Sequence, residues 1–143
     1  MSSITIYHNP QCGTSRNVLA LIRNTGAEPI IIEYLVTPPT REKLTELLTQ
    51  MAIPARDLLR QKGVLYDELG LNDLSLGESA LIEAMLAHPI LINRPIVQTA
   101  LGTRLCRPSE AVIDILLLPQ QAKFTKEDGE PVINEQGERI AGR

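Results

Sequence analysis

One cysteine in this sequence stands where a reactive thiolate is expected. Cys12 follows the alternating, β-rich stretch 4–8 and precedes a segment with helical spacing, so it lies where a predicted strand leads into a predicted helix. Unpaired backbone N–H groups and the helix dipole stabilise negative charge there. A thiol at this position is expected to have a lowered pKa, and the same N–H groups can hold an oxyanion beside the sulfur. The chemistry indicated is nucleophilic attack by Cys12 on a charged oxyanion.

The neighbours of Cys12 refine this prediction. Gly13 leaves the approach to the sulfur open, and Ser15 and the threonine before it add hydroxyl donors. The run 12–15 resembles a Cys-x-x-Cys redox motif with serine as its second cysteine, so a disulfide formed at Cys12 must be resolved by another molecule or a distant thiol. A cationic His8 would favour the thiolate, although a histidine at a strand end can equally have no task. Arg16 can help electrostatically or be a solvated surface charge.

The composition limits the class of protein. The chain has 143 residues, 43% of them hydrophobic and only 3% aromatic, which suits one domain with a core of Leu, Ile and Val. A net charge of -3 and a pI of about 5.4 argue against a general nucleic-acid binder. We expect no membrane span and no signal peptide, and therefore a cytoplasmic protein. In that compartment thiols stay reduced, and Cys106 is interpreted as a buried apolar thiol.

The hydrophobic periodicity predicts an alternation of strands and helices. Residues 4–34 indicate a β-α-β unit with a parallel pair, in which Thr14 or Ser15 caps the helix and Gly26 follows its end. Helical segments follow from Thr40, from Pro54 and over 79–87, with a loop or broken helix at 63–72. Two short strands at 96–97 and 105–106, joined by a turn at 100–103, predict a β-hairpin. Ser109 is expected to cap a last helix that Pro119 ends.

This order predicts an α/β protein with a thioredoxin-like fold: β-α-β, a helical insertion, a β-hairpin and a C-terminal helix. We expect a single domain over 1–118 with the insertion at about 40–88, followed by a polar, loosely packed tail over 119–143. This is an analogy at the level of the fold and does not by itself establish an activity.

Three arginines are candidates to bind an oxyanion. Arg60 follows an apolar pair, while Arg94 and Arg107 each precede a proline beside the predicted hairpin. Guanidinium groups donate two coplanar hydrogen bonds, which suits tetrahedral oxyanions, although most arginines are simply solvated. In a thioredoxin-like plan the loop before the hairpin faces the cysteine and holds a cis-proline. Pro95 is placed to be that residue, and Arg94 would then project toward Cys12.

Several long motifs in a fixed order resemble one family. They surround Cys12, the three arginines and Cys106, and the match extends over almost the whole chain, to about Gly129. The sequence is similar to the glutaredoxin-coupled arsenate reductases of the plasmid-encoded bacterial type, within a thioredoxin-fold family that also includes the Spx-like proteins. The matching segments are 7–16, 34–35, 37–40, 58–60, 88–97 and 102–109.

The resemblance implies a mechanism and a set of site residues. Cys12 matches the nucleophile that forms a covalent adduct with arsenate, and His8 matches the residue thought to lower its pKa. Arg60, Arg94 and Arg107 match the oxyanion-binding arginines. Ser15, as a hydroxyl donor beside the cysteine, is a further candidate for substrate binding. Glutathione would attack the adduct as co-substrate, and glutaredoxin would complete the reduction to arsenite, in a route of arsenic detoxification. The resemblance implies no metal, no tightly bound cofactor, and no nucleic-acid or membrane partner. Cys106 matches a cysteine that is not essential.

Three alternatives remain open at this stage. An Spx-type regulator shares the fold and binds RNA polymerase, but it typically carries Cys-x-x-Cys, whereas Ser15 stands here. A glutathione-dependent thiol oxidoreductase of another substrate would use the same cysteine. A thioredoxin-fold binding module would leave Cys12 inert.

Overall fold

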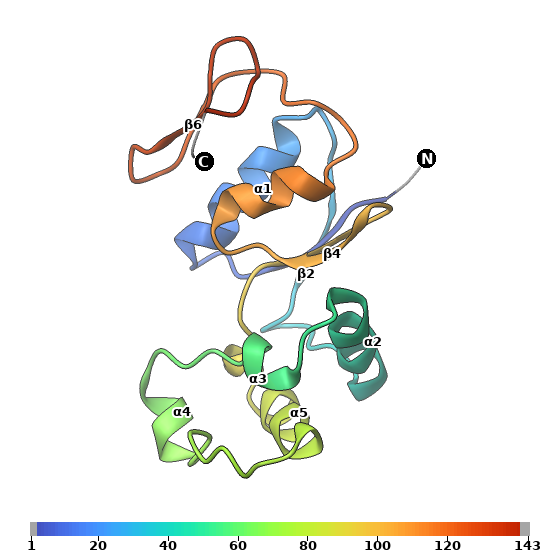
Figure 1. The fold of residues 1–143 in the computed structure, drawn as a ribbon, viewed down its shortest axis with the longest axis vertical. Helices are drawn as coiled ribbons and strands as arrows, with labels where there is room; N and C mark the ends of the chain where they lie inside the picture. The colour runs from blue at the N-terminus through green and yellow to red at the C-terminus, as the bar shows by residue number, and fades with distance from the viewer. Residues whose placement is uncertain (1–2, 141–143) are drawn as a thin grey trace. The chain divides into compact units, whose positions relative to one another are not determined.

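The computed structural model describes residues 3–140 (Figure 1). Contacts group the chain into two compact units. The first contains the residues up to Ile32 and those from Arg94 onward, and the second contains 33–93. The segment expected to be a helical insertion lies within the second unit.

The first unit is built on a four-stranded sheet. Its strands are β1 (Thr5–His8), β2 (Ile30–Glu33), β3 (Ile96–Thr99) and β4 (Gly102–Leu105), in the order β2-β1-β3-β4. β3 is antiparallel to both of its neighbours, and Ile6 of β1 stands opposite Val97 of β3. The predicted β-α-β unit and β-hairpin are therefore present, and the sheet with its helices is the expected α/β, thioredoxin-like arrangement.

Two helices cover one face of this sheet. α1 (Gly13–Arg23) and the 3-10 helix η2 (Ser109–Ile115) lie side by side on it (Figure 1). The helical spacing of Val18, Leu21 and Ile22 directs all three into the core, where none has exposed surface. The core of this unit comprises Ile6, Val18, Leu21, Ile22, Val97, Cys106, Val112, Ile115, Val132 and Ile133.

Two helix caps differ from the sequence prediction. Cys12 itself is the N-cap of α1, so neither Thr14 nor Ser15 caps it. The cap of the last helix is Pro108 rather than Ser109, and that helix is a 3-10 helix that ends at Ile115. The β-branched residues of η2 have low α-helix propensity, which is consistent with this short, tighter form.

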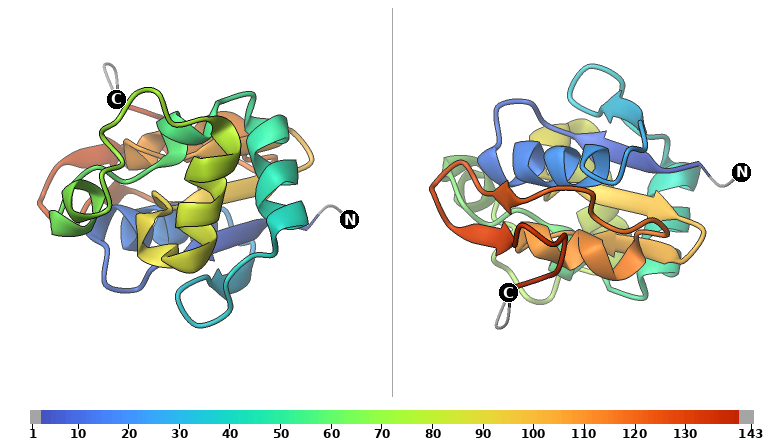
Figure 2. Two further views of the ribbon diagram at one scale, coloured as in Figure 1. Left: turned by 90° about the horizontal axis from the view of Figure 1, so that it is seen from below. Right: turned by 90° about the horizontal axis from the view of Figure 1, so that it is seen from above.

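Residues 119–140 of the expected loose tail contain an ordered hairpin, and residues 141–143 of it lie outside the described residues. β5 (Phe124–Thr125) pairs antiparallel with β6 (Pro131–Ile133), and both lie near α1 and η2 (Figure 2). Val132 and Ile133 are 0% and 1% exposed and belong to the core of the first unit. The prediction of loose packing was wrong because few apolar residues in a polar segment suffice to dock it, provided that the core offers a complementary surface.

The second unit is helical. It contains α2 (Arg41–Met51), α3 (Ala55–Leu58), α4 (Val64–Glu68), α5 (Glu78–Ala87) and the 3-10 helix η1 (Pro89–Leu91). Thr40 caps α2 as predicted, because its side chain accepts a hydrogen bond from the Lys43 N–H at 3.1 Å. The Glu78 carboxylate accepts one from the Ala55 N–H at 2.8 Å and so joins α5 to the start of α3. Within residues 3–140, no helix is both long enough and apolar enough to cross a membrane.

Candidate active site

The loop between β1 and α1 presents Cys12 at the helix N-terminus. The Cys12 N–H donates to the Asn9 carbonyl at 3.0 Å, and the Cys12 carbonyl accepts the first helical hydrogen bond from the Arg16 N–H at 3.0 Å. The Asn9 side chain closes the turn by accepting from the Gln11 N–H at 2.9 Å. The predicted position of Cys12, between strand and helix, is confirmed.

The surroundings of the Cys12 thiol favour its ionised form. Burial of the side chain, which is 8% exposed, raises the thiol's pKa. The backbone N–H of Ser15 and the guanidinium groups of Arg94 and Arg107 outweigh this effect and hold the pKa of Cys12 below its ordinary value. Arg107 Nη1 donates to Cys12 Sγ at 3.8 Å. The site therefore stabilises a thiolate by one helix-terminal N–H and two cations.

The two arginines are fixed beside the sulfur by the β3–β4 hairpin. Arg94 lies two residues before β3 and Arg107 two residues after β4, and Arg107 Nη1 donates to the Arg94 carbonyl at 3.0 Å. The predicted cis peptide at Pro95 is confirmed, and the peptide between Arg107 and Pro108 is cis as well. Arg94, only 8% exposed, reaches Cys12 as the sequence predicted.

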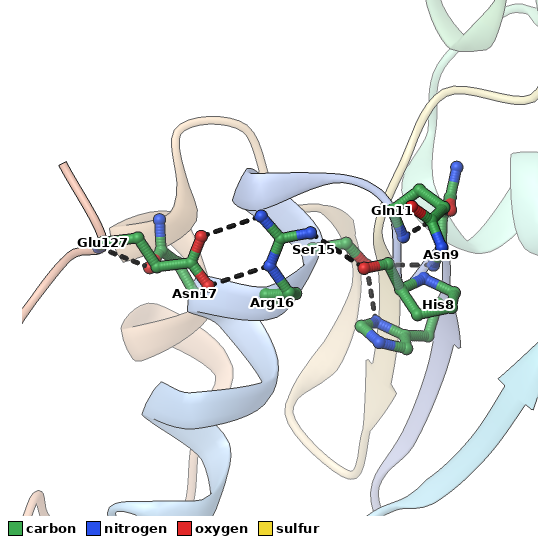
Figure 3. A network of polar contacts seen from close by, with 8 residues as sticks. His8, Asn9, Gln11, Ser15, Arg16, Asn17 and Glu127 are labelled. Carbon is green, nitrogen blue, oxygen red and sulfur yellow. Dashed lines mark hydrogen bonds and ion pairs between the residues drawn. The ribbon is translucent and has the colours of Figure 1, made fainter.

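His8 and Ser15 form a buried polar contact behind the loop. His8 Nδ1 lies 2.7 Å from Ser15 Oγ, and the same oxygen accepts from the Asn9 N–H at 3.1 Å (Figure 3). Ser15 was expected to contact the substrate, but it is fully buried and its hydroxyl is engaged inside the protein. Ser15 acts on Cys12 through its backbone N–H, and His8 holds Ser15 in place. A direct electrostatic effect of His8 on the thiol stays a prediction.

Arg16 links this loop to the C-terminal hairpin. Its Nη1 donates to the Pro10 carbonyl at 2.8 Å, and its Nε and Nη2 donate to the two carboxylate oxygens of Glu127, each at 2.8 Å (Figure 3). Glu127 was not among the residues expected from the sequence, since no local pattern connects residues 111 positions apart. The role of Asn9 was missed as well, although the Asn-Pro turn signal was available.

The other predicted residues lie elsewhere. Arg60 belongs to the second unit, where its backbone N–H donates to the Leu91 carbonyl at 2.7 Å, and its role as an oxyanion ligand stays a prediction. Cys106 is fully buried in the core of the first unit, as expected, and burial raises the pKa of its thiol to about 12. Among residues 3–140, no cluster of three or more His, Cys, Asp or Glu side chains is placed to hold a metal ion.

The arrangement around Cys12 can attack an anionic electrophile. A thiolate and a doubly charged oxyanion repel each other by about 4 kcal/mol for each pair of unit charges 4 Å apart at an effective dielectric of about 20. Arg94 and Arg107 offset that repulsion, and their N–H groups can donate to oxygens that gain charge during the reaction.

Comparisons with known proteins point to one family. The model of the ArsC family matches residues 7–115. The arsenate reductase of Yersinia enterocolitica is 60% identical over 140 residues, which cover 98% of this chain and 99% of that protein. The arsenate reductase of Escherichia coli strain K12 is 59% identical over the same length. The solved structure of an arsenate reductase from Vibrio cholerae superimposes with a TM-score of 0.76 at 46% identity, covering 80% of this chain and 98% of that chain.

Proposed function

The chain belongs to the ArsC family, and from this membership and the site around Cys12 we propose that it is an arsenate reductase that uses glutathione and glutaredoxin. The observation that carries the proposal is the Cys12 thiol, whose pKa is lowered by the Ser15 N–H, Arg94 and Arg107. Relatives named arsenate reductase match nearly the full length of the chain, which supports arsenate as the substrate.

In the first step the Cys12 thiolate attacks the arsenic of arsenate. A sulfur–arsenic bond forms, one arsenic–oxygen bond breaks, and the departing oxygen is protonated and leaves as water, so arsenic remains As(V). Arg94 and Arg107 donate to the remaining oxygens and disperse the negative charge. Arg60 is the third proposed oxyanion ligand. The Ser15 N–H, held by the contact of Ser15 with His8, lowers the pKa of the Cys12 thiol against the effect of burial and so favours the thiolate before the attack.

In the second step glutathione supplies the other sulfur. Its thiolate attacks arsenic and displaces a second oxygen as water. A disulfide then forms between Cys12 and glutathione, and the electron pair released as the two sulfurs join reduces As(V) to As(III). The arsenic keeps two oxygens, takes up one water and leaves as arsenite. The run 12–15 has no second cysteine, so a glutaredoxin thiol attacks the glutathione sulfur and releases the Cys12 thiolate. The scheme uses no tightly bound cofactor and fits the cytoplasm, where thiol reductants are kept reduced.

The test is a coupled assay with arsenate, glutathione, glutaredoxin, NADPH and glutathione reductase. We expect arsenate-dependent NADPH oxidation by the wild type and none by Cys12→Ser, because a serine hydroxyl is not ionised at neutral pH. Cys106→Ser is the matched control, and it should retain turnover because the buried Cys106 thiol takes no part in the scheme. Turnover in Cys12→Ser would refute the mechanism.

The same assay separates the alternative functions. Activity on a glutathionylated substrate with none on arsenate would indicate a thiol oxidoreductase of another substrate. Capture of RNA polymerase by a protein that turns over neither compound would indicate the Spx-like alternative.

A further inference from the structure

The connection between β5 and β6 contacts α1, the helix that follows Cys12. Glu127 lies in this connection, and its two carboxylate oxygens accept from Nε and Nη2 of Arg16, each at 2.8 Å. The Glu127 N–H donates to the side-chain oxygen of Asn17, the next residue of α1, at 3.1 Å. Glu127 therefore contacts two consecutive residues of the first turns of α1 with both its side chain and its backbone (Figure 3).

The third donor of Arg16 reaches the loop that presents Cys12. Its Nη1 donates to the Pro10 carbonyl at 2.8 Å, so the guanidinium spans from Glu127 to the residue two positions before Cys12. The Arg16 and Glu127 side chains are 43% and 51% exposed, and an exposed ion pair of that kind contributes little to stability by itself. A bidentate ion pair does, however, fix the orientation of the guanidinium plane. That orientation determines whether Nη1 can donate to the Pro10 carbonyl.

The pair also lies against the residue that follows Cys12. A side chain built at Gly13 would have its Cβ 3.6 Å from Arg16 Nη2 and 3.7 Å from Glu127 Oε1. The hydrogen bonds that Arg16 donates to Glu127 raise the pKa of Arg16 most, against the effect of burial, and the charge on Cys12 adds to the increase. Arg16 is thus close enough to the sulfur for the two charges to interact.

From this geometry we propose that Glu127 is a positioning residue for the reaction of Cys12: it orients Arg16, and through Arg16 the Pro10 carbonyl and the loop that presents the sulfur. The residues matched by the family model end at 115, so Glu127 lies outside them. The inference rests on the proposed function for its effect on turnover, but the state of the thiol can be measured without arsenate.

The experiment compares Glu127→Ala with Arg16→Gln. The rate of iodoacetamide alkylation of Cys12 is measured against pH, and kcat and KM for arsenate are measured beside it. Glu135→Gln is the control, because it removes one negative charge from an exposed residue just after β6. Thermal unfolding of every variant shows whether the fold is retained.

In Glu127→Ala, the loss of charge and the loss of loop positioning predict opposite shifts in the pKa of Cys12. Removal of a nearby carboxylate should by charge alone lower the pKa of Cys12. If Glu127 positions the loop, its loss should instead raise that pKa by about half a unit, which lowers the thiolate fraction about threefold below the pKa. Arg16→Gln should raise the pKa of Cys12 whether Arg16 acts through its charge or by positioning the loop. Glu135→Gln should leave the pKa of Cys12 unchanged. We expect kcat for arsenate to fall in Glu127→Ala and in Arg16→Gln, while KM changes little. An unchanged or lowered Cys12 pKa in Glu127→Ala would overturn the proposal, even if the protein reduces arsenate.

A pair exchange gives a second test. In the double variant Arg16→Glu with Glu127→Arg, the ion pair can form again, but a glutamate at position 16 cannot donate to the Pro10 carbonyl. The unfolding temperature should stay close to that of the wild type, because the exposed pair contributes little to stability, while kcat stays low. A wild-type kcat in this double variant would show that Glu127 only anchors the hairpin.

Discussion

The two cysteines show how far the environment of a residue decides its chemistry. Cys12 and Cys106 are both mostly or fully buried, and burial raises the pKa of each thiol. At Cys12 the Ser15 N–H and two guanidinium groups reverse that effect, whereas at Cys106 burial prevails and the pKa is about 12. The difference lies in the hydrogen-bond donors that face the sulfur, since the residue type is the same.

This contrast predicts selective alkylation. At neutral pH iodoacetamide should modify Cys12 and leave Cys106 untouched in the folded protein, because the pKa of Cys12 is lowered while that of the buried Cys106 is about 12. The rate at Cys12 should fall as pH drops through its lowered pKa. Peptide mass spectrometry after a timed reaction identifies the modified residue. Equal labelling of both cysteines in the folded protein would contradict the assignment, and labelling after urea unfolding shows that Cys106 is chemically competent.

The two arginines beside the sulfur predict a large loss of turnover on truncation. Arg94→Ala and Arg107→Ala should each lower kcat for arsenate about 100-fold or more, the usual effect of removing one donor from an oxyanion site. Arg139→Ala is a suitable control, because Arg139 pairs with Asp114 on the surface and should leave kcat unchanged. Steady-state kinetics measure each effect. Substantial activity in the double variant Arg94→Ala with Arg107→Ala would exclude their role as an oxyanion clamp.

At the scale of the elements, a buried ion pair joins the C-terminal hairpin to η2. Lys126 Nζ lies 3.0 Å from Glu110 Oε1, and their side chains are 12% and 8% exposed. Burial raises the pKa of Glu110, but its own backbone N–H and Lys126 outweigh burial, so the pKa is lowered. A carboxylate with a lowered folded pKa stabilises the fold above its unfolded pKa of about 4.3, and that stabilisation is lost as pH falls through the folded value.

Glu110→Gln should therefore destabilise the protein in a pH-dependent way. At pH 7 we expect the free energy of unfolding to fall by about 2 kcal/mol, the scale of a hydrogen bond between charged groups. The difference from the wild type should begin to shrink as pH falls below the unfolded pKa of about 4.3, and it should vanish below the lowered folded pKa, where the carboxylate is protonated in the folded wild type too. Urea unfolding at pH 7 and pH 3 measures both values, with the exposed Glu135→Gln as the control. A destabilisation of equal size at the two pH values would contradict a stabilising role for the ionised Glu110 carboxylate.

At the scale of the whole molecule, the C-terminal segment is part of the first unit. Val132 and Ile133 complete its core, and the Gln120 side chain donates to the Leu21 carbonyl at 3.0 Å at the end of α1. Although the matched family segment ends at residue 115, the core of this chain extends to Ile133.

Removal of residues 120–143 should therefore destabilise the protein strongly. Burial of Val132 and Ile133 alone contributes about 3 to 6 kcal/mol, so we expect the unfolding temperature to fall by about 10 °C or more. Calorimetry measures the shift, and binding of an apolar dye reports the exposed core. A truncated protein as stable as the full chain would show that the hairpin is dispensable.

The local sequence determined those features that depend on near neighbours. The strand before Cys12, the helix after it, the β-hairpin and the Thr40 cap all follow from periodicity or turn chemistry. The cis peptide at Pro95 followed from the thioredoxin-like plan that these elements compose. The reactive cysteine could be chosen over Cys106 on the same grounds, since a strand-to-helix junction is visible in the residue order.

Only the tertiary structure decided which groups meet across long separations. Arg107 lies 95 residues from Cys12, and Glu127 lies 111 residues from Arg16, and no periodic pattern links either pair. The Ser15 hydroxyl was assigned to the substrate because its partner, the His8 ring, was not evident from spacing alone. The ordered tail was missed for the same reason: Val132 and Ile133 are too few to suggest packing until a core that accepts them is in place. Local propensity is set by adjacent residues, whereas docking depends on the shape and charge of surfaces that exist only after folding.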